Sequence, residues 1–139
     1  MRLVATFISI SLFATSVWGH GEDKPGPNDG FIRMPGAFHT EIVPISKNQL
    51  KVFLLDIYWK NPSVKDSALH LMYQGETKIT AVCEIKESLY YLCSFPKSID
   101  LTKKGEIVVE AQRESQKGNL VTYELPLKLK KIDDGHSGH

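Results

Sequence analysis

The sequence predicts a single all-β domain, and three observations support this prediction. Seven or eight short stretches of β-forming residues recur at a spacing of about 8–12 residues, separated by turn-forming positions. Residues 49–59, QLKVFLLDIYW, are apolar on both faces over most of their length, which is typical of a central strand. No stretch shows the sustained 3.6-residue period of an amphipathic helix. Together these patterns favour an immunoglobulin-like β-sandwich of seven to eight antiparallel strands.

The expected strands follow from alternating apolar positions and from the turn residues between them. They cover residues 31–34, 37–45, 49–59, 67–74, 77–85, 89–95, 106–113 and 120–129. The last two are expected to form a hairpin around residues 117–119. The residues expected to be deeply buried are Val52, Leu54, Leu55, Ile57, Leu69, Leu71, Leu125 and Leu127.

Residues 1–19 have the features of an export signal. Arg2 is their one charge, residues 3–17 are largely apolar, and Val17 and Gly19 meet the small-x-small requirement of a signal peptidase. Cleavage after Ser16 is the main alternative, and a retained N-terminal anchor is another. The apolar run is short for a membrane span, so we expect no stable membrane insertion after cleavage. The mature chain then begins at His20, in the periplasm or secreted.

Three further segments follow the signal. Residues 20–30 contain two prolines and three glycines and are expected to form a flexible arm. Residues 31–131 form the sandwich domain. Residues 132–139, IDDGHSGH, have too few apolar groups to pack and are expected to be disordered. The tail histidines, His136 and His139, fit a solvated tail better than a metal site.

Charge and motifs exclude several function classes. Loss of Arg2 with the signal leaves 16 basic and 16 acidic residues, so no basic field exists to attract nucleic acid. The chain has no Gly-rich phosphate loop, no His-Glu-x-x-His and no serine in a nucleophile elbow. We therefore expect that the protein is not an enzyme.

The two cysteines predict one disulfide, because cysteine pairs of exported proteins form disulfides in oxidising compartments. Ser88 lies midway between Cys83 and Cys93, so a hairpin folded about Ser88 sets the two cysteines opposite each other. Such a short bridge contributes roughly 2–3 kcal/mol. A thiolate metal site is the alternative interpretation.

Metal ligation is the chemistry that the remaining residues suggest. A free His20 offers an amine and an imidazole, which suit Cu(II), and Met34 offers the thioether that favours Cu(I). His39 is the expected anchor ligand, with Met34 facing it across neighbouring strands. The third ligand is expected from His20 or from the pair His70 and Met72. Copper is the preferred ion, with zinc or silver as alternatives.

Each of these residues also has a simpler interpretation. A histidine at a new N-terminus is often incidental, and His39 and His70 are also typical of the polar face of a strand. Met34 and Met72 are also typical of side chains that fill gaps in a core.

The stretch GPNDGFIRMPGAFHTEIV, residues 26–43, followed by LKVFLLDIYWKNP, resembles a family of small exported modules. These occur alone or at the start of heavy-metal efflux adaptor proteins in Gram-negative bacteria. The resemblance implies a β-sandwich linked to copper, silver or zinc handling. His39 and Glu41 correspond to the family's His-x-Glu. Asn28 and Asp29 stand where the family has His-Gly, so its metal site is weakened, relocated to His20, or lost.

An exposed N-terminal histidine also resembles the copper histidine brace of periplasmic carriers and of copper monooxygenases. The leading hypothesis is a periplasmic protein that sequesters or delivers copper, with an efflux or other envelope protein as partner. The rival hypothesis is a metal-free sandwich that mediates protein–protein interaction in the cell envelope. A copper-dependent enzyme is the third.

Overall fold

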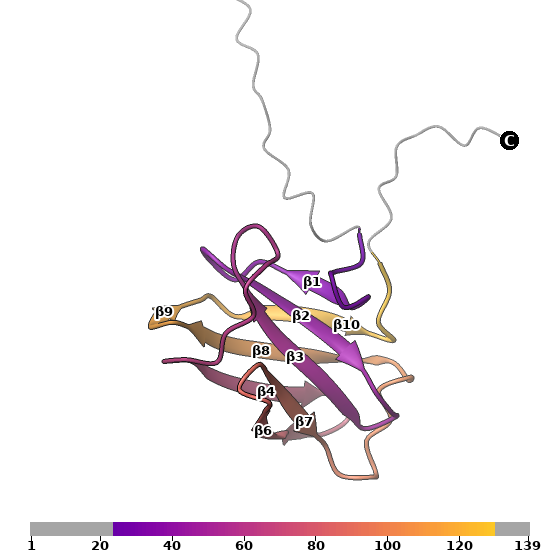
Figure 1. The fold of residues 1–139 in the computed structure, drawn as a ribbon. Coiled ribbons are helices and arrows are strands. Elements are labelled where there is room, and N and C mark those ends of the chain that lie inside the picture. Colours follow the sequence, from indigo (N-terminus) through magenta and orange to yellow (C-terminus); the bar gives the residue numbers. More distant parts are fainter. Residues whose placement is uncertain (1–23, 130–139) are drawn as a thin grey trace, which may run out of the picture.

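The computed structural model describes residues 24–129, which form two antiparallel sheets of five strands each, packed face to face (Figure 1). The first sheet has the order β1-β2-β3-β7-β6. The second has the order β10-β8-β4-β5, with β9 paired to β8. The strands are β1 (Phe31–Arg33), β2 (His39–Pro44), β3 (Gln49–Leu55), β4 (Ala68–Gln74), β5 (Lys78–Thr80), β6 (Val82–Lys86), β7 (Tyr90–Ser94), β8 (Gly105–Arg113), β9 (Gln116–Lys117) and β10 (Val121–Leu125). The all-β prediction is confirmed.

The hydrophobic core lies between the two sheets and draws on both. Its fully buried members include Leu54 from β3, Leu71 from β4 and Tyr123 from β10. The Tyr123 hydroxyl donates to the Thr40 carbonyl oxygen at 3.0 Å and lies 2.6 Å from the Thr40 hydroxyl. The buried hydroxyl groups of Thr40 and Tyr123 therefore have hydrogen-bond partners within the core. Within residues 24–129, no helix is long and apolar enough to span a membrane.

Two buried arginines bridge the sheets. Arg33 on β1 donates its Nε hydrogen to the Thr122 carbonyl oxygen on β10 at 3.2 Å. Arg113 on β8 donates its Nε hydrogen to the Leu54 carbonyl oxygen on β3, also at 3.2 Å. One bridge starts from each sheet, so each guanidinium adds a polar contact between the layers.

The predicted central strand 49–59 is confirmed as central but is shorter than expected. β3 ends at Leu55, because the Asp56 carboxylate accepts the backbone amides of Tyr58 and Lys60 at 2.9 Å each. Trp59 lies in the left-handed region, with φ of 63°. The expected burial of Ile57 is wrong, since its side chain is 47% exposed.

The other burial predictions divide into two groups. Val52, Leu54, Leu55, Leu71 and Leu125 are buried as expected. Leu69 and Leu127 are only partly buried, because they pack at the periphery of the core.

The predicted strand 77–85 is split between the two sheets. β5 pairs with β4 in the second sheet, and β6 pairs with β7 in the first. The chain changes sheet at Ala81, whose amide donates to the Leu71 carbonyl oxygen at 2.9 Å. Splitting this stretch and adding β9 gives ten strands in the described residues rather than the expected seven to eight.

The hairpins differ in how well the sequence predicts them. Cys83 and Cys93 form the expected disulfide across directly opposed positions of β6 and β7. The last hairpin turns at Glu114 and Ser115, not at residues 117–119. Both residues have positive φ, of 46° and 66°, which a two-residue turn between twisted strands requires.

We predict that substitution by alanine distinguishes the residues of β3 from the exposed residues that follow it. Leu54→Ala removes a side chain with no exposed area and should lower the free energy of unfolding by about 2–5 kcal/mol. Ile57→Ala should change it by less than about 1 kcal/mol, because Ile57 lies beyond the end of β3. Urea unfolding of both variants measures this, and equal losses would contradict the boundary at Leu55.

Candidate functional site

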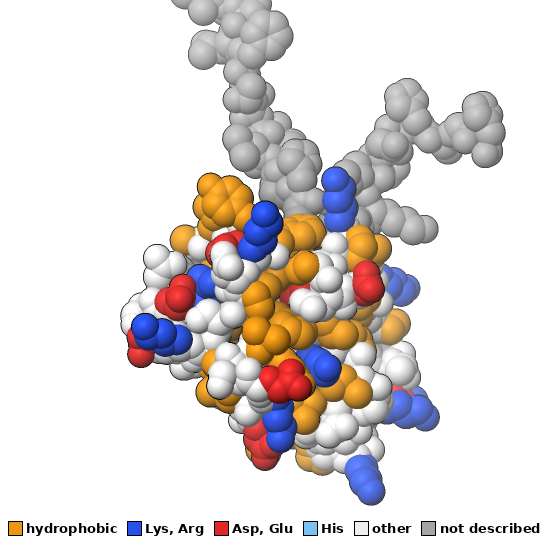
Figure 2. Space-filling model, viewed as in Figure 1, with side chains coloured by type: hydrophobic (Ala, Val, Ile, Leu, Met, Phe, Trp, Pro, Cys, Tyr) orange, Lys and Arg blue, Asp and Glu red, His pale blue; other side chains and the backbone are white. Residues whose placement is uncertain are grey.

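The alternation of β2 decides which candidate ligands face outward. Thr40 contacts the Tyr123 hydroxyl and Ile42 has no exposed area, so these two point into the core. His39 and Glu41 therefore share the outer face of the first sheet. Figure 2 shows hydrophobic side chains gathered on this face.

The outer face carries its own small apolar cluster. Ile32, Phe53 and Leu55 are buried there, with Val43, Trp59 and Tyr90 packed against them. The Phe53 and Tyr90 rings lie 5.2 Å apart between centroids. An outer sheet face with buried apolar side chains is unusual for a sandwich, because such faces usually meet water.

Glu41 is fully buried on this face and binds the preceding turn. Its Oε2 accepts the backbone amides of Asn28 and Gly30, both at 2.9 Å, and its Oε1 accepts the Asn28 side-chain amide at 2.8 Å. A Cβ atom at Gly26 would collide with the carboxylate, so this close approach requires glycine there. Glu41 thus holds residues 26–30 against the sheet, and three of its acceptor sites are in use.

His39 is 6% exposed and is oriented by a backbone carbonyl. Its Nδ1 lies 3.0 Å from the Asp56 carbonyl oxygen. A carbonyl oxygen can only accept, so Nδ1 carries the hydrogen, and in the neutral ring Nε2 then holds the lone pair. Metal-binding histidines are commonly fixed by such a bond from the other ring nitrogen. The Trp59 ring lies edge-on to His39, with 6.0 Å between centroids.

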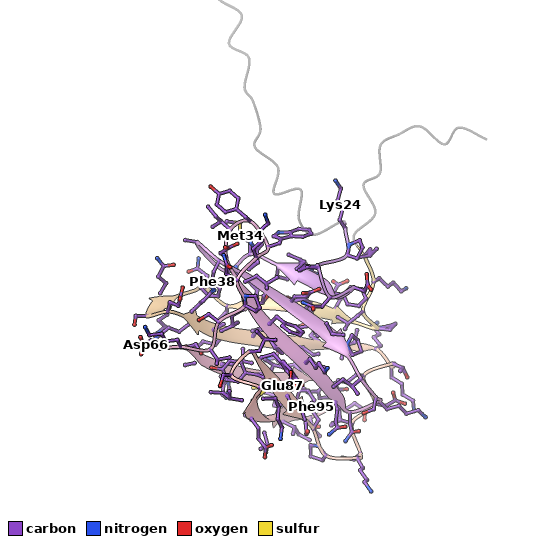
Figure 3. The ribbon with its side chains drawn as sticks, viewed as in Figure 1. Lys24, Met34, Phe38, Asp66, Glu87 and Phe95 are labelled. Atoms are coloured by element: carbon purple, nitrogen blue, oxygen red, sulfur yellow. A yellow bond between two sulfur atoms is a disulfide. The ribbon has the colours of Figure 1, made fainter. Side chains whose placement is uncertain are left out.

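Met34 follows directly after β1 and is 50% exposed. The β1–β2 register pairs Arg33 with Thr40 and Ile32 with Glu41. The ladder ends at the Arg33–Thr40 pair, and in the sequence Met34 follows Arg33 while His39 precedes Thr40. Figure 3 shows Met34 at the same end of the sandwich as Phe38, the residue that precedes β2.

His70 and Met72 lie elsewhere. Both are on β4, on either side of the core residue Leu71, so they face outward from the second sheet. His70 is exposed and opposite Glu110, while Met72 is half-buried between Val108 and Thr80. The core separates this pair from His39, and the structure does not bring them together.

The described residues contain no group of three or more His, Cys, Asp or Glu side chains arranged to hold a metal ion. His39 and Met34 are the two described candidate ligands that adjoin the same end of the β1–β2 ladder. His20 lies outside the described residues.

The loop after β3 is an additional feature that the sequence pattern did not reveal. The Asp56 carboxylate accepts two backbone amides and the Asn61 side-chain amide, while Arg113 donates to the Asn61 carbonyl oxygen at 2.6 Å. This bonding presents Tyr58 to solvent at 75% exposure. The sequence feature that could have indicated this loop is Asp56, which precedes Lys60 by four residues and Asn61 by five. Asp side chains commonly bind nearby backbone amides.

We predict that Glu41→Gln destabilises the domain by about 1–3 kcal/mol, because an amide cannot accept all three donors at once. Chemical unfolding measures the loss. Glu124→Gln, an exposed glutamate on β10, is the matched control and should change the stability by less than about 0.5 kcal/mol. Equal effects in the two variants would contradict the anchoring role of Glu41.

We also predict an acid transition in the loop. Hydrogen bonding, first from the Lys60 backbone amide, lowers the pKa of the Asp56 carboxyl below its ordinary value. The folded loop therefore gains stability above the unfolded pKa and loses it as pH falls through the lowered folded pKa. In NMR titrations the Tyr58 and Lys60 amides should shift with that carboxyl. Asp56→Asn should abolish this transition, and its persistence would contradict the assignment.

No family model, curated protein or solved structure matches this chain. The resemblance drawn from residues 26–43 therefore stays a prediction.

Proposed function

We propose that this chain is an exported, immunoglobulin-like β-sandwich that binds copper for sequestration or delivery, rather than an enzyme. The observation that carries the proposal is the fixed His39 ring. Its Nδ1 hydrogen is directed to the Asp56 carbonyl oxygen, so Nε2 is the nitrogen left for a ligand role. Met34 and His39 adjoin the Arg33–Thr40 pair of β1 and β2, which supports pairing them in one site.

The donor set fits a soft ion in part. An imidazole nitrogen and a thioether sulfur suit Cu(I) better than magnesium or calcium, which prefer oxygen ligands. Silver or zinc is the alternative ion. Two ligands are too few for tight binding, so the proposal takes the third from His20 at the mature N-terminus.

The disulfide supports the proposed export, because such bonds persist in oxidising compartments. In this proposal the protein acts in the periplasm or outside the cell. Its partner is an efflux or other envelope protein that gives or receives the metal ion.

A second candidate function is a metal-free module that binds another envelope protein. The exposed side chains of Ile57 and Tyr58, on a loop held by Asp56 and Arg113, favour it. Rigidly presented aromatic side chains lose little conformational entropy on binding.

Copper titration distinguishes the two candidates. The mature protein should bind one ion, and His39→Ala should lose at least about tenfold in affinity, since about 1.4 kcal/mol is tenfold. Met34→Leu should weaken Cu(I) more than Cu(II), because it removes the soft sulfur. A truncated form without His20 should also bind more weakly.

His70→Ala is the matched control, because His70 lies on the opposite face of the sandwich. It should retain the affinity of the unmodified chain. Binding should weaken in mild acid, because a protonated imidazole cannot ligate. Equal affinity in the unmodified chain, His39→Ala and the truncated form would remove the proposed site and favour the metal-free module.

A further inference from the structure

The β6–β7 hairpin presents an apolar sheet edge. β6 is the last strand of the first sheet, and within residues 24–129 only β7 pairs with it. Val82 and Ile85 on β6 are 68% and 53% exposed, and Leu89 in the following turn is also exposed. Figure 3 marks Glu87 in this turn. Unpaired edges with apolar side chains are templates for pairing with another strand.

The disulfide identifies which backbone groups of β6 are free. Cys83 and Cys93 have Cα atoms 4.1 Å apart, which is the close spacing of a non-hydrogen-bonded antiparallel pair. Pairs of the two kinds alternate along a ladder. Glu84 and Lys86 therefore bond to β7, while the amide and carbonyl groups of Cys83 and Ile85 point to the open edge.

This pattern limits how a second β6 can pair with the first. A symmetric antiparallel pair must set outward-pointing groups against each other, which places Cys83, Glu84 or Ile85 on the two-fold axis. With Cys83 on the axis, Glu84 lies opposite Val82 and has no charged partner across the strands. With Glu84 on the axis, two carboxylates face each other, which is destabilising. With Ile85 on the axis, Glu84 of each copy lies opposite Lys86 of the other, which makes two pairs of opposite charge.

We propose that the edge binds a second copy of this chain, with β6 pairing antiparallel to β6 about an axis through Ile85. Charge complementarity favours a second copy as the partner. In an antiparallel pair about Ile85, the acidic residue 84 of each copy lies opposite the basic residue 86 of the other. The pairing joins two first sheets into one continuous sheet and covers the exposed Ile85 side chains. It lies at the edge opposite β1, so it is independent of the proposed copper site.

The contact is one short strand on each side, so the dimer should be weak and depend on concentration. Its ion pairs are exposed at the surface, so high salt should weaken it further. Sedimentation equilibrium of the mature protein over a range of concentrations measures the association.

Charge reversal supplies the decisive comparison. Glu84→Lys and Lys86→Glu each set like charges opposite one another, and each should reduce association at least about tenfold. The double reversal, Glu84→Lys with Lys86→Glu, restores complementarity and should restore association. It also restores the bridge of 3.2 Å between these residues within one chain, so thermal unfolding of each variant separates folding from association.

Ile85→Lys tests the axis without changing that bridge, because it places two ammonium groups together. It should abolish the dimer. Ile45→Lys is the matched control, since Ile45 is 48% exposed at another turn, and it should leave association unchanged. Hydrogen exchange at the Ile85 amide should slow as concentration rises, while the Glu84 amide is already protected by β7.

Three results of the association measurements would overturn the proposal. These are a monomer at every concentration, a dimer that survives Ile85→Lys, and a double reversal that associates no better than the single ones. Slow exchange at Ile85 that does not depend on concentration would also overturn it, because another segment of the same chain would then occupy the edge.

Discussion

The alternation of β2 is the constraint on which the candidate site depends. Its inward residue Thr40 is tied to Tyr123 in the core, so a slip of one position would expose Ile42 and bury His39 between the sheets. Because the core fixes this register, the outward positions of His39 and Glu41 are fixed as well. The histidine ring and the buried carboxylate owe their placement to contacts on the opposite side of the same strand.

The two outward residues have different roles. Glu41 uses its oxygens to hold residues 26–30 on the sheet, where the backbone amide and the side-chain amide of Asn28 supply two of the three donors. Asn28 therefore forms one structural unit with the Glu41 carboxylate. His39 instead contacts the loop after β3.

That loop is in turn attached to both sheets. Arg113 reaches from β8 to the Leu54 carbonyl oxygen at the end of β3 and to the Asn61 carbonyl oxygen in the loop. The Asp56 carbonyl oxygen then orients His39. The Leu54 carbonyl oxygen also accepts the Ser63 backbone amide at 3.1 Å, so the loop and the guanidinium meet at the same acceptor. The candidate ligand is therefore supported from the second sheet through the loop.

The sequence by itself determined the features that depend on neighbouring residues. The alternation of side chains along residues 67–74 set Leu71 on one face of the strand and His70 and Met72 on the other. The position of Ser88 midway between the two cysteines predicted that they pair. Only the tertiary structure decided where β3 ends, where the chain changes sheet and what Glu41 binds. An apolar run such as residues 49–59 has the same pattern whether or not Asp56 turns the backbone away. The bonds from Glu41 join residues 11 and 13 positions apart, and periodicity within one strand cannot report contacts between segments that meet only after folding.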